Sequence, residues 1–192
     1  MTGPAPREEP PLLADPRRWG GVAGLVGGIT FVAGYSPALG PAASTLAWLA
    51  GGLLTGMALF ALFVRKVPLG ESVRPRPLAL ATYCGCVVGE LVLIGAGSRF
   101  LAASGRDELR LALVVVVVGL HFVPFAWAFR ERMFLRLGAC LTVLGAAGLL
   151  AGALGVPRAA EATAVVAGLT MPALITLYAL GRFRPAAPTP PG

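Results

Sequence analysis

Residues 109–129 read LRLALVVVVVGLHFVPFAWAF, a stretch in which only Arg110, near its start, and His121 are ionisable. A helix rises 1.5 Å per residue, so about 20 apolar residues cross a hydrocarbon core about 30 Å thick. The stretch therefore predicts a transmembrane helix. It also places one histidine well inside that helix.

Five more apolar stretches of similar length follow the same rule. The chain of 192 residues is 56% hydrophobic and 13% charged, whereas a soluble domain has about 25% charged residues. We therefore expect an all-α, polytopic bundle of six helices in one domain over residues 17–184. Residues 1–16 and 185–192 are Pro-rich and polar, and both are predicted to be disordered tails. The other five predicted spans are Trp19–Leu39, Ala42–Val64, Pro77–Gly97, Met133–Val156 and Ala159–Leu180.

Basic residues alternate in number between the two predicted sides of the membrane. The positive-inside rule places the richer side in the cytoplasm, which predicts that both termini are cytoplasmic. Arginine is used almost to the exclusion of lysine, a bias typical of GC-rich bacterial genomes, so we expect a multi-pass protein of the bacterial cytoplasmic membrane. The predicted inner residues are Arg7, Arg17, Arg18, Arg65, Lys66, Arg74, Arg76, Arg130, Arg132, Arg136, Arg182 and Arg184, and the outer ones are Arg99, Arg106, Arg110 and Arg158.

The net charge of +7 does not indicate nucleic acid binding. The basic residues flank apolar stretches instead of gathering on one folded face. The expected partner is the lipid bilayer, with no nucleic acid.

Glu90 and His121 are the only ionisable residues deep inside the predicted helices. By helix rise, Glu90 lies about 18 Å from the inner end of its helix and His121 about 14 Å from the inner end of the next one. A charge at such depth is expensive, which predicts that the two side chains face the bundle interior and contact each other. Two interpretations stay open: a structural clasp between two helices, and a proton relay or ligand contact.

Glycines spaced four residues apart predict close helix packing, because they let backbones approach. Packing within the chain and dimerisation through the same faces are both compatible with this pattern. The packing glycines are Gly20, Gly24, Gly28, Gly52, Gly56, Gly85, Gly89, Gly148 and Gly152. Pro124 and Pro172 interrupt two helices and predict kinks, since proline removes a backbone hydrogen bond.

The sequence argues against an enzyme. A single histidine excludes a bis-histidine haem site and a multi-histidine metal cluster. The chain also has no recognisable nucleophile motif or phosphate-binding loop, and it leaves no room for a soluble catalytic domain. We therefore expect neither a metal nor another cofactor.

The stretch Gly119-Leu-His-Phe-Val-Pro-Phe-Ala126 resembles a Gly-x-His-Phe-x-Pro-x-Ala pattern of small uncharacterised bacterial integral membrane proteins. The resemblance covers one helix and implies a shared architecture. The resemblance implies no particular activity. The residues that it singles out are Gly119, His121, Phe122, Pro124 and Ala126.

Two functions fit these observations. One is small-solute or proton-linked transport, with Glu90 as proton acceptor and His121 as its partner. The other is an accessory or assembly protein without transport, which binds another membrane subunit or a second copy through its glycine-rich faces. The first predicts a hydrated path to the pair, and the second predicts small-residue grooves that face lipid.

Overall fold

The computed structural model describes residues 15–65, 67, 77–129 and 131–183. It confirms the predicted class: these residues form six long apolar helices and contain no strand. Each helix is long and apolar enough to cross a membrane. The helices are α1 (Pro16–Tyr35), α2 (Pro41–Phe63), α3 (Pro77–Ala103), α4 (Arg110–Phe129), α5 (Arg132–Ala153) and α6 (Ala159–Ala179).

Local signals explain where the boundaries differ from expectation. The helix α1 begins at Pro16, because the Asp15 carboxylate accepts a hydrogen bond from the Arg17 N–H and proline fits the first helical turn. The helix α3 runs six residues beyond the expected end at Gly97 and is followed by Gly105, whose φ of 66° lies in the left-handed region. The predicted tails lie outside the described residues, apart from Asp15 and Pro16.

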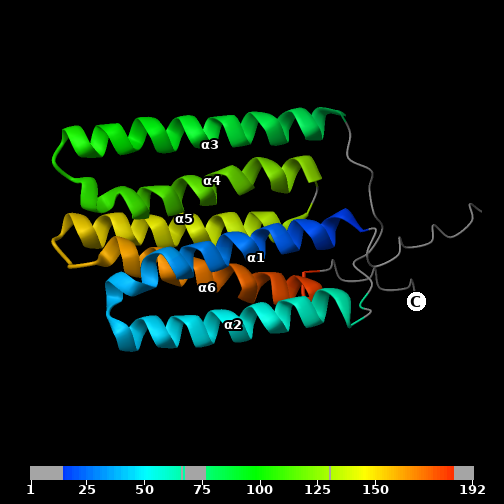
Figure 1. Cartoon of the computed structure of the whole chain (residues 1–192). Coiled ribbons are helices and arrows are strands. Elements are labelled where there is room, and N and C mark those ends of the chain that lie inside the picture. Colours follow the sequence, from blue (N-terminus) through cyan, green and yellow to red (C-terminus); the bar gives the residue numbers. More distant parts are fainter. Residues whose placement is uncertain (1–14, 66, 68–76, 130, 184–192) are drawn as a thin grey trace, which may run out of the picture.

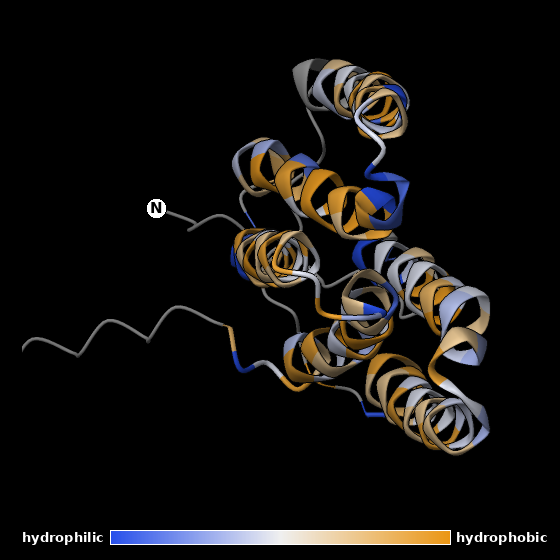
Figure 2. Cartoon of the chain, turned by 90° about the vertical axis from the view of Figure 1, so that its left-hand side faces the viewer, coloured by the Kyte–Doolittle hydropathy of each residue, from blue (hydrophilic) through white to orange (hydrophobic). Residues whose placement is uncertain are grey.

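The six helices run alternately up and down, so the first and last described residues lie at the same end of the bundle (Figure 1). We call this the terminal end and the opposite one the far end. The helix α6 is central and packs against α1, α2, α4 and α5. The helix α3 is peripheral and packs mainly against α4, and it stands apart when the bundle is viewed along its axis (Figure 2).

The closest packing joins α4 to α5. A Cβ atom on Gly145 would lie 2.5 Å from the backbone nitrogen of Val116, and one on Gly138 would lie 2.7 Å from the carbonyl oxygen of Gly119. Gly138, Gly145 and Gly152 are spaced seven residues apart, the repeat of a left-handed helix pair. Glycine is therefore required at 138 and 145, because backbone meets backbone there.

The predicted packing glycines divide into two groups. Gly24 and Gly28 on α1 meet α6, where a Cβ on Gly28 would lie 2.7 Å from the Gly168 carbonyl oxygen. Gly148 meets the Thr163 side chain, and Gly152 meets Leu109. In the second group, a Cβ would meet nothing within 4 Å among the described residues. This group is Gly20, Gly52, Gly56, Gly85 and Gly89.

Both interrupting prolines lie inside helices that continue on either side of them. Pro124 is within α4 and Pro172 within α6. Pro172 is buried against α1, where its Cδ would lie 3.2 Å from a Cβ on Gly28. At this position the ring fills the space that the glycine leaves.

Candidate functional site

The seam between α3 and α4 is built on residues seven positions apart. Tyr83, at one end of the seam, stacks on Phe125 with ring centroids 5.4 Å apart. At the other end, Leu113 fills the space over Gly97, where a Cβ would lie 2.5 Å from its Cδ2 atom. Glu90 is midway between Tyr83 and Gly97, so the heptad repeat carries a carboxylate at its centre.

The structure brings the two predicted residues together. Nδ1 of His121 lies 3.3 Å from Oε2 of Glu90, and their side chains are 14% and 18% exposed. The contact does not meet hydrogen-bond geometry, and Nδ1 has no hydrogen-bond partner among the described residues. The distance is therefore that of an ion pair, whose attraction depends on charge more than on direction.

Aromatic side chains surround the imidazole. Its ring centroid lies 4.2 Å from that of Phe122 and 5.1 Å from that of Phe125, and the second contact is edge-on. Phe122 also stacks on Phe134 of α5, at 6.0 Å. These rings fix the imidazole on the α3 side of α4 and tie its position to α5.

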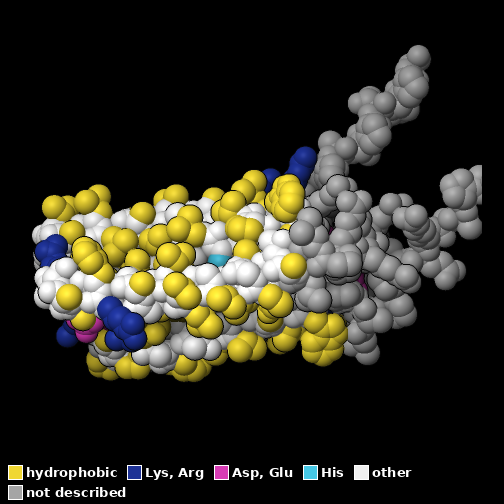
Figure 3. Space-filling view, turned by 90° about the horizontal axis from the view of Figure 1, so that it is seen from above, with side chains coloured by type: hydrophobic (Ala, Val, Ile, Leu, Met, Phe, Trp, Pro, Cys, Tyr) yellow, Lys and Arg dark blue, Asp and Glu magenta, His cyan; other side chains and the backbone are white. Residues whose placement is uncertain are grey.

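Access to the pair is lateral. Along the seam, the Tyr83–Phe125 stack closes one direction and Leu113 against Gly97 closes the other. The chain's single histidine is nevertheless visible from the α3 side, among hydrophobic side chains (Figure 3). The remaining exposure of the pair therefore opens sideways, toward the surface that lipid would cover.

This arrangement can hold two helices together by charge. A carboxylate and an imidazole within ion-pair distance attract each other only when both are charged. Protonation of the carboxylate or deprotonation of the imidazole removes that attraction. The strength with which α3 is held against α4 then depends on the protonation state of the pair.

A second polar cluster lies at the terminal end, and sequence reasoning missed it. Arg17 binds Asp15 in two ways, with its Nη2 atom 2.9 Å and its Nε atom 3.0 Å from the two carboxylate oxygens. Glu131, just before α5, lies close to the hydroxyl of Tyr178 on α6 and to the Arg17 charge. The cluster joins α1, α5 and α6, whose polar residues are far apart in sequence.

The two carboxyl groups of this cluster respond in opposite ways to their surroundings. Burial raises the pKa of Glu131, and the nearby Arg17 charge and Tyr178 hydroxyl only partly oppose it. Burial also acts to raise the pKa of Asp15, but hydrogen bonds from Arg17 outweigh it and the net pKa is lowered. Asp15 is therefore held in its charged form, while Glu131 is shifted toward its protonated form.

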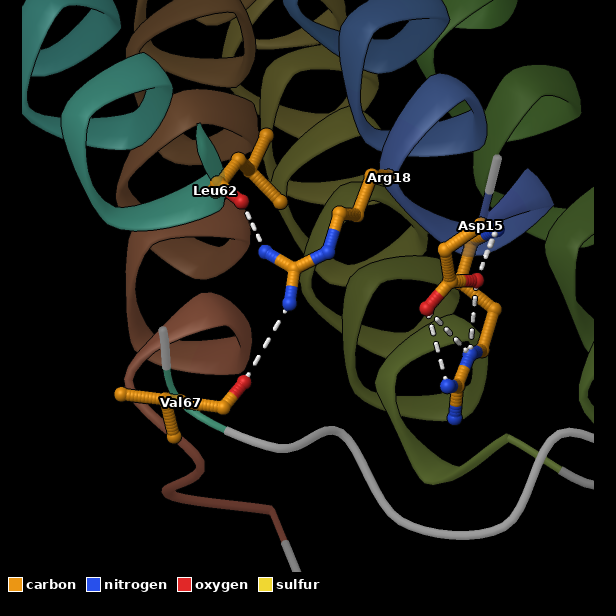
Figure 4. A network of polar contacts seen from close by, with 5 residues as sticks. Asp15, Arg18, Leu62 and Val67 are labelled. Atoms are coloured by element: carbon orange, nitrogen blue, oxygen red, sulfur yellow. Dashed lines mark hydrogen bonds and ion pairs between the residues drawn. The ribbon is translucent and has the colours of Figure 1, made fainter. Parts of the chain in front are cut away.

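Arg18 caps the C-terminal end of α2 by hydrogen bonds. Its side chain is 3% exposed, and the guanidinium donates to the carbonyl oxygens of Leu62 and of Val67, the latter at 3.3 Å (Figure 4). A cation there also complements the negative end of the α2 dipole. Its neighbour Arg17 points to Asp15 instead, so two adjacent arginines tie α1 to different partners.

No metal site emerges within the described ranges: they hold no group of three or more His, Cys, Asp or Glu side chains placed to bind an ion. Comparison of the chain with protein-family models, with curated proteins and with solved structures gave no match. The site itself therefore carries the functional argument.

Proposed function

We propose that this multi-pass membrane protein is a small proton-linked transporter of the bacterial cytoplasmic membrane, with both termini in the cytoplasm. Glu90 binds and releases the proton, and His121 is its partner. Movement of the peripheral helix α3 relative to α4 couples protonation to passage of a solute. We do not assign it an enzymatic activity.

One observation carries this proposal. The contact between Glu90 and His121 lies at the centre of the α3–α4 seam, and among the six helices only α3 has no buried residue over its described side chains, 81–103. A helix held by one seam separates more easily than a central one such as α6, in which more than half of the apolar stretch is buried. Intramembrane ionisable residues commonly mark proton relays and ion pathways.

The distribution of arginines supports the orientation. The terminal end of the described structure carries six arginines and the far end carries four. The excess at the terminal end favours the cytoplasm for that end. The six are Arg17, Arg18, Arg65, Arg132, Arg136 and Arg182, and the four are Arg99, Arg106, Arg110 and Arg158.

The test is difference infrared spectroscopy of the protein in lipid, with Glu90→Gln to assign the carboxyl band. A Glu90 band that titrates and shifts in His121→Phe supports a water-accessible proton site. Proton uptake into proteoliposomes with an internal pH dye then measures transport, and Glu90→Gln is expected to abolish it. Glu161→Gln, at the far end, is the control. A Glu90 band that never titrates contradicts the proposal.

A second function is favoured by the glycines that no helix of this chain covers. Gly52 and Gly56 lie one turn apart on an exposed part of α2 that no other described helix covers, and small residues of this kind let a second membrane helix approach closely. Förster transfer between labelled copies, diluted with lipid, tests self-association. Gly52→Ile with Gly56→Ile is expected to abolish the transfer if this part of α2 is the interface. Gly20→Ile, also in open space but on α1, is the matched control.

A further inference from the structure

Three exposed arginines gather where α5 begins and α6 ends. Arg132 is the first residue of α5, and Arg136 lies one turn further along the same helix. Arg182 follows the end of α6, next to Phe183, and the guanidinium carbon of Arg136 lies 4.3 Å from the Phe183 ring centroid. We call Arg132, Arg136 and Arg182 the arginine patch.

The acidic groups that the structure describes at this end are engaged elsewhere. Asp15 is bound by Arg17, and Glu131 lies close to Tyr178 and to the Arg17 charge. Among the residues that the structure describes, the three arginines of the patch form no ion pair. The patch therefore presents positive charge that the described side chains do not neutralise.

Exposed tryptophans place the patch at the headgroup level. Trp127, which is 72% exposed, lies two residues before the end of α4, and Trp19, which is 54% exposed, lies in the first turn of α1. Both are at the terminal end, and tryptophan is enriched where a membrane meets water. Arg136 starts about 6 Å deeper than Arg132 by helix rise, so its side chain must extend outward to keep its charge at that level.

We infer that the arginine patch binds the phosphate-bearing headgroup of an anionic phospholipid. Arg136 contacts the phosphate from the membrane side while its guanidinium packs on Phe183, and Arg132 and Arg182 flank the headgroup. The acyl chains lie along the exposed apolar surface of α5, where Leu135 is 51% and Val143 is 68% exposed. This inference is independent of the proton-linked function of Glu90 and His121.

The test is native mass spectrometry of lipid adducts on the purified full chain in detergent. Phosphatidylglycerol is titrated against phosphatidylcholine with the same acyl chains, because both carry a phosphate but only the first has a net negative charge. A basic residue near the surface contributes about fivefold to the binding of anionic lipid. We expect phosphatidylglycerol to bind roughly a hundredfold more tightly than phosphatidylcholine, and the triple change to glutamine to remove that preference.

Matched variants make the result interpretable. Arg99→Gln removes an exposed arginine at the far end and is expected to leave the preference unchanged. Arg136→Lys retains the charge, so it should keep most of the preference while Arg136→Gln loses about fivefold. Excess inorganic phosphate should not displace the lipid, since acyl chains hold it. Equal binding of both lipids, displacement by phosphate, or an equal loss in Arg99→Gln overturns the inference, and tryptophan fluorescence confirms that each variant is folded.

Discussion

The distance between Glu90 and His121 allows the coupling free energy between these two residues to be predicted. Two opposite unit charges 3.3 Å apart attract by about 5 kcal/mol at an effective dielectric constant of 20, and by about 1.3 kcal/mol at that of water. A neutral polar contact between membrane helices contributes about 0.6 kcal/mol on average. Because the two atoms are not aligned as a hydrogen bond, a neutral pair has no means of exceeding that value.

A double-mutant cycle separates these cases. Glu90→Gln removes the charge and keeps the shape, and His121→Phe keeps an aromatic ring among its aromatic neighbours. Unfolding free energies come from reversible unfolding in bicelles, followed by tryptophan fluorescence. We expect a coupling free energy between about 1.3 and 5 kcal/mol if the pair is ionised.

The control cycle pairs Glu90→Gln with Glu131→Gln, in the terminal cluster. Separate sites should be additive within about 0.5 kcal/mol. A coupling of 0.6 kcal/mol or less for Glu90 and His121 would refute the ionised pair. It would also remove the physical basis of α3 docking that responds to protonation.

Three further predictions concern packing, pH and the end of α2. Gly145→Ala should destabilise the protein by about 1–3 kcal/mol, because its Cβ would meet the α4 backbone, whereas Gly85→Ala, in open space, should not destabilise it; thermal unfolding in detergent measures both. The raised pKa of Glu131 means that the folded state binds its proton more tightly than the unfolded state. The unfolding free energy should therefore fall as pH rises from 4.5, the ordinary pKa of a glutamate, through the raised pKa of Glu131. Glu131→Gln should remove this pH dependence. Arg18→Gln leaves the Leu62 carbonyl unpaired and should cost about 1–3 kcal/mol of unfolding free energy, against little change for the exposed Arg65→Gln.

The helices follow from composition and length alone, because a hydrocarbon core forces every backbone group to be satisfied within its own segment. The proximity of Glu90 and His121 was also predictable, since costly charges at similar depths on antiparallel neighbouring helices have few other partners. For the packing glycines, the sequence left contacts within the chain and contacts between chains both open. Four-residue spacing describes right-handed crossings, whereas the α4–α5 seam uses a seven-residue spacing through Gly138 and Gly145, which the sequence also displays.

The terminal cluster was beyond sequence reasoning for a different reason. Asp15 was assigned to a disordered tail, and Glu131 stood in a short connection between two helices, where charged residues are ordinarily solvated. Their burial depends on how the ends of α1, α5 and α6 converge, which no local pattern encodes. That convergence leaves α3 outside: the described polar contacts of the terminal cluster and of Arg18 involve α1, α2, α5 and α6, whereas the Glu90–His121 contact lies between α3 and α4. A change in the charge of this pair therefore acts on the helix that packs least against the rest of the bundle.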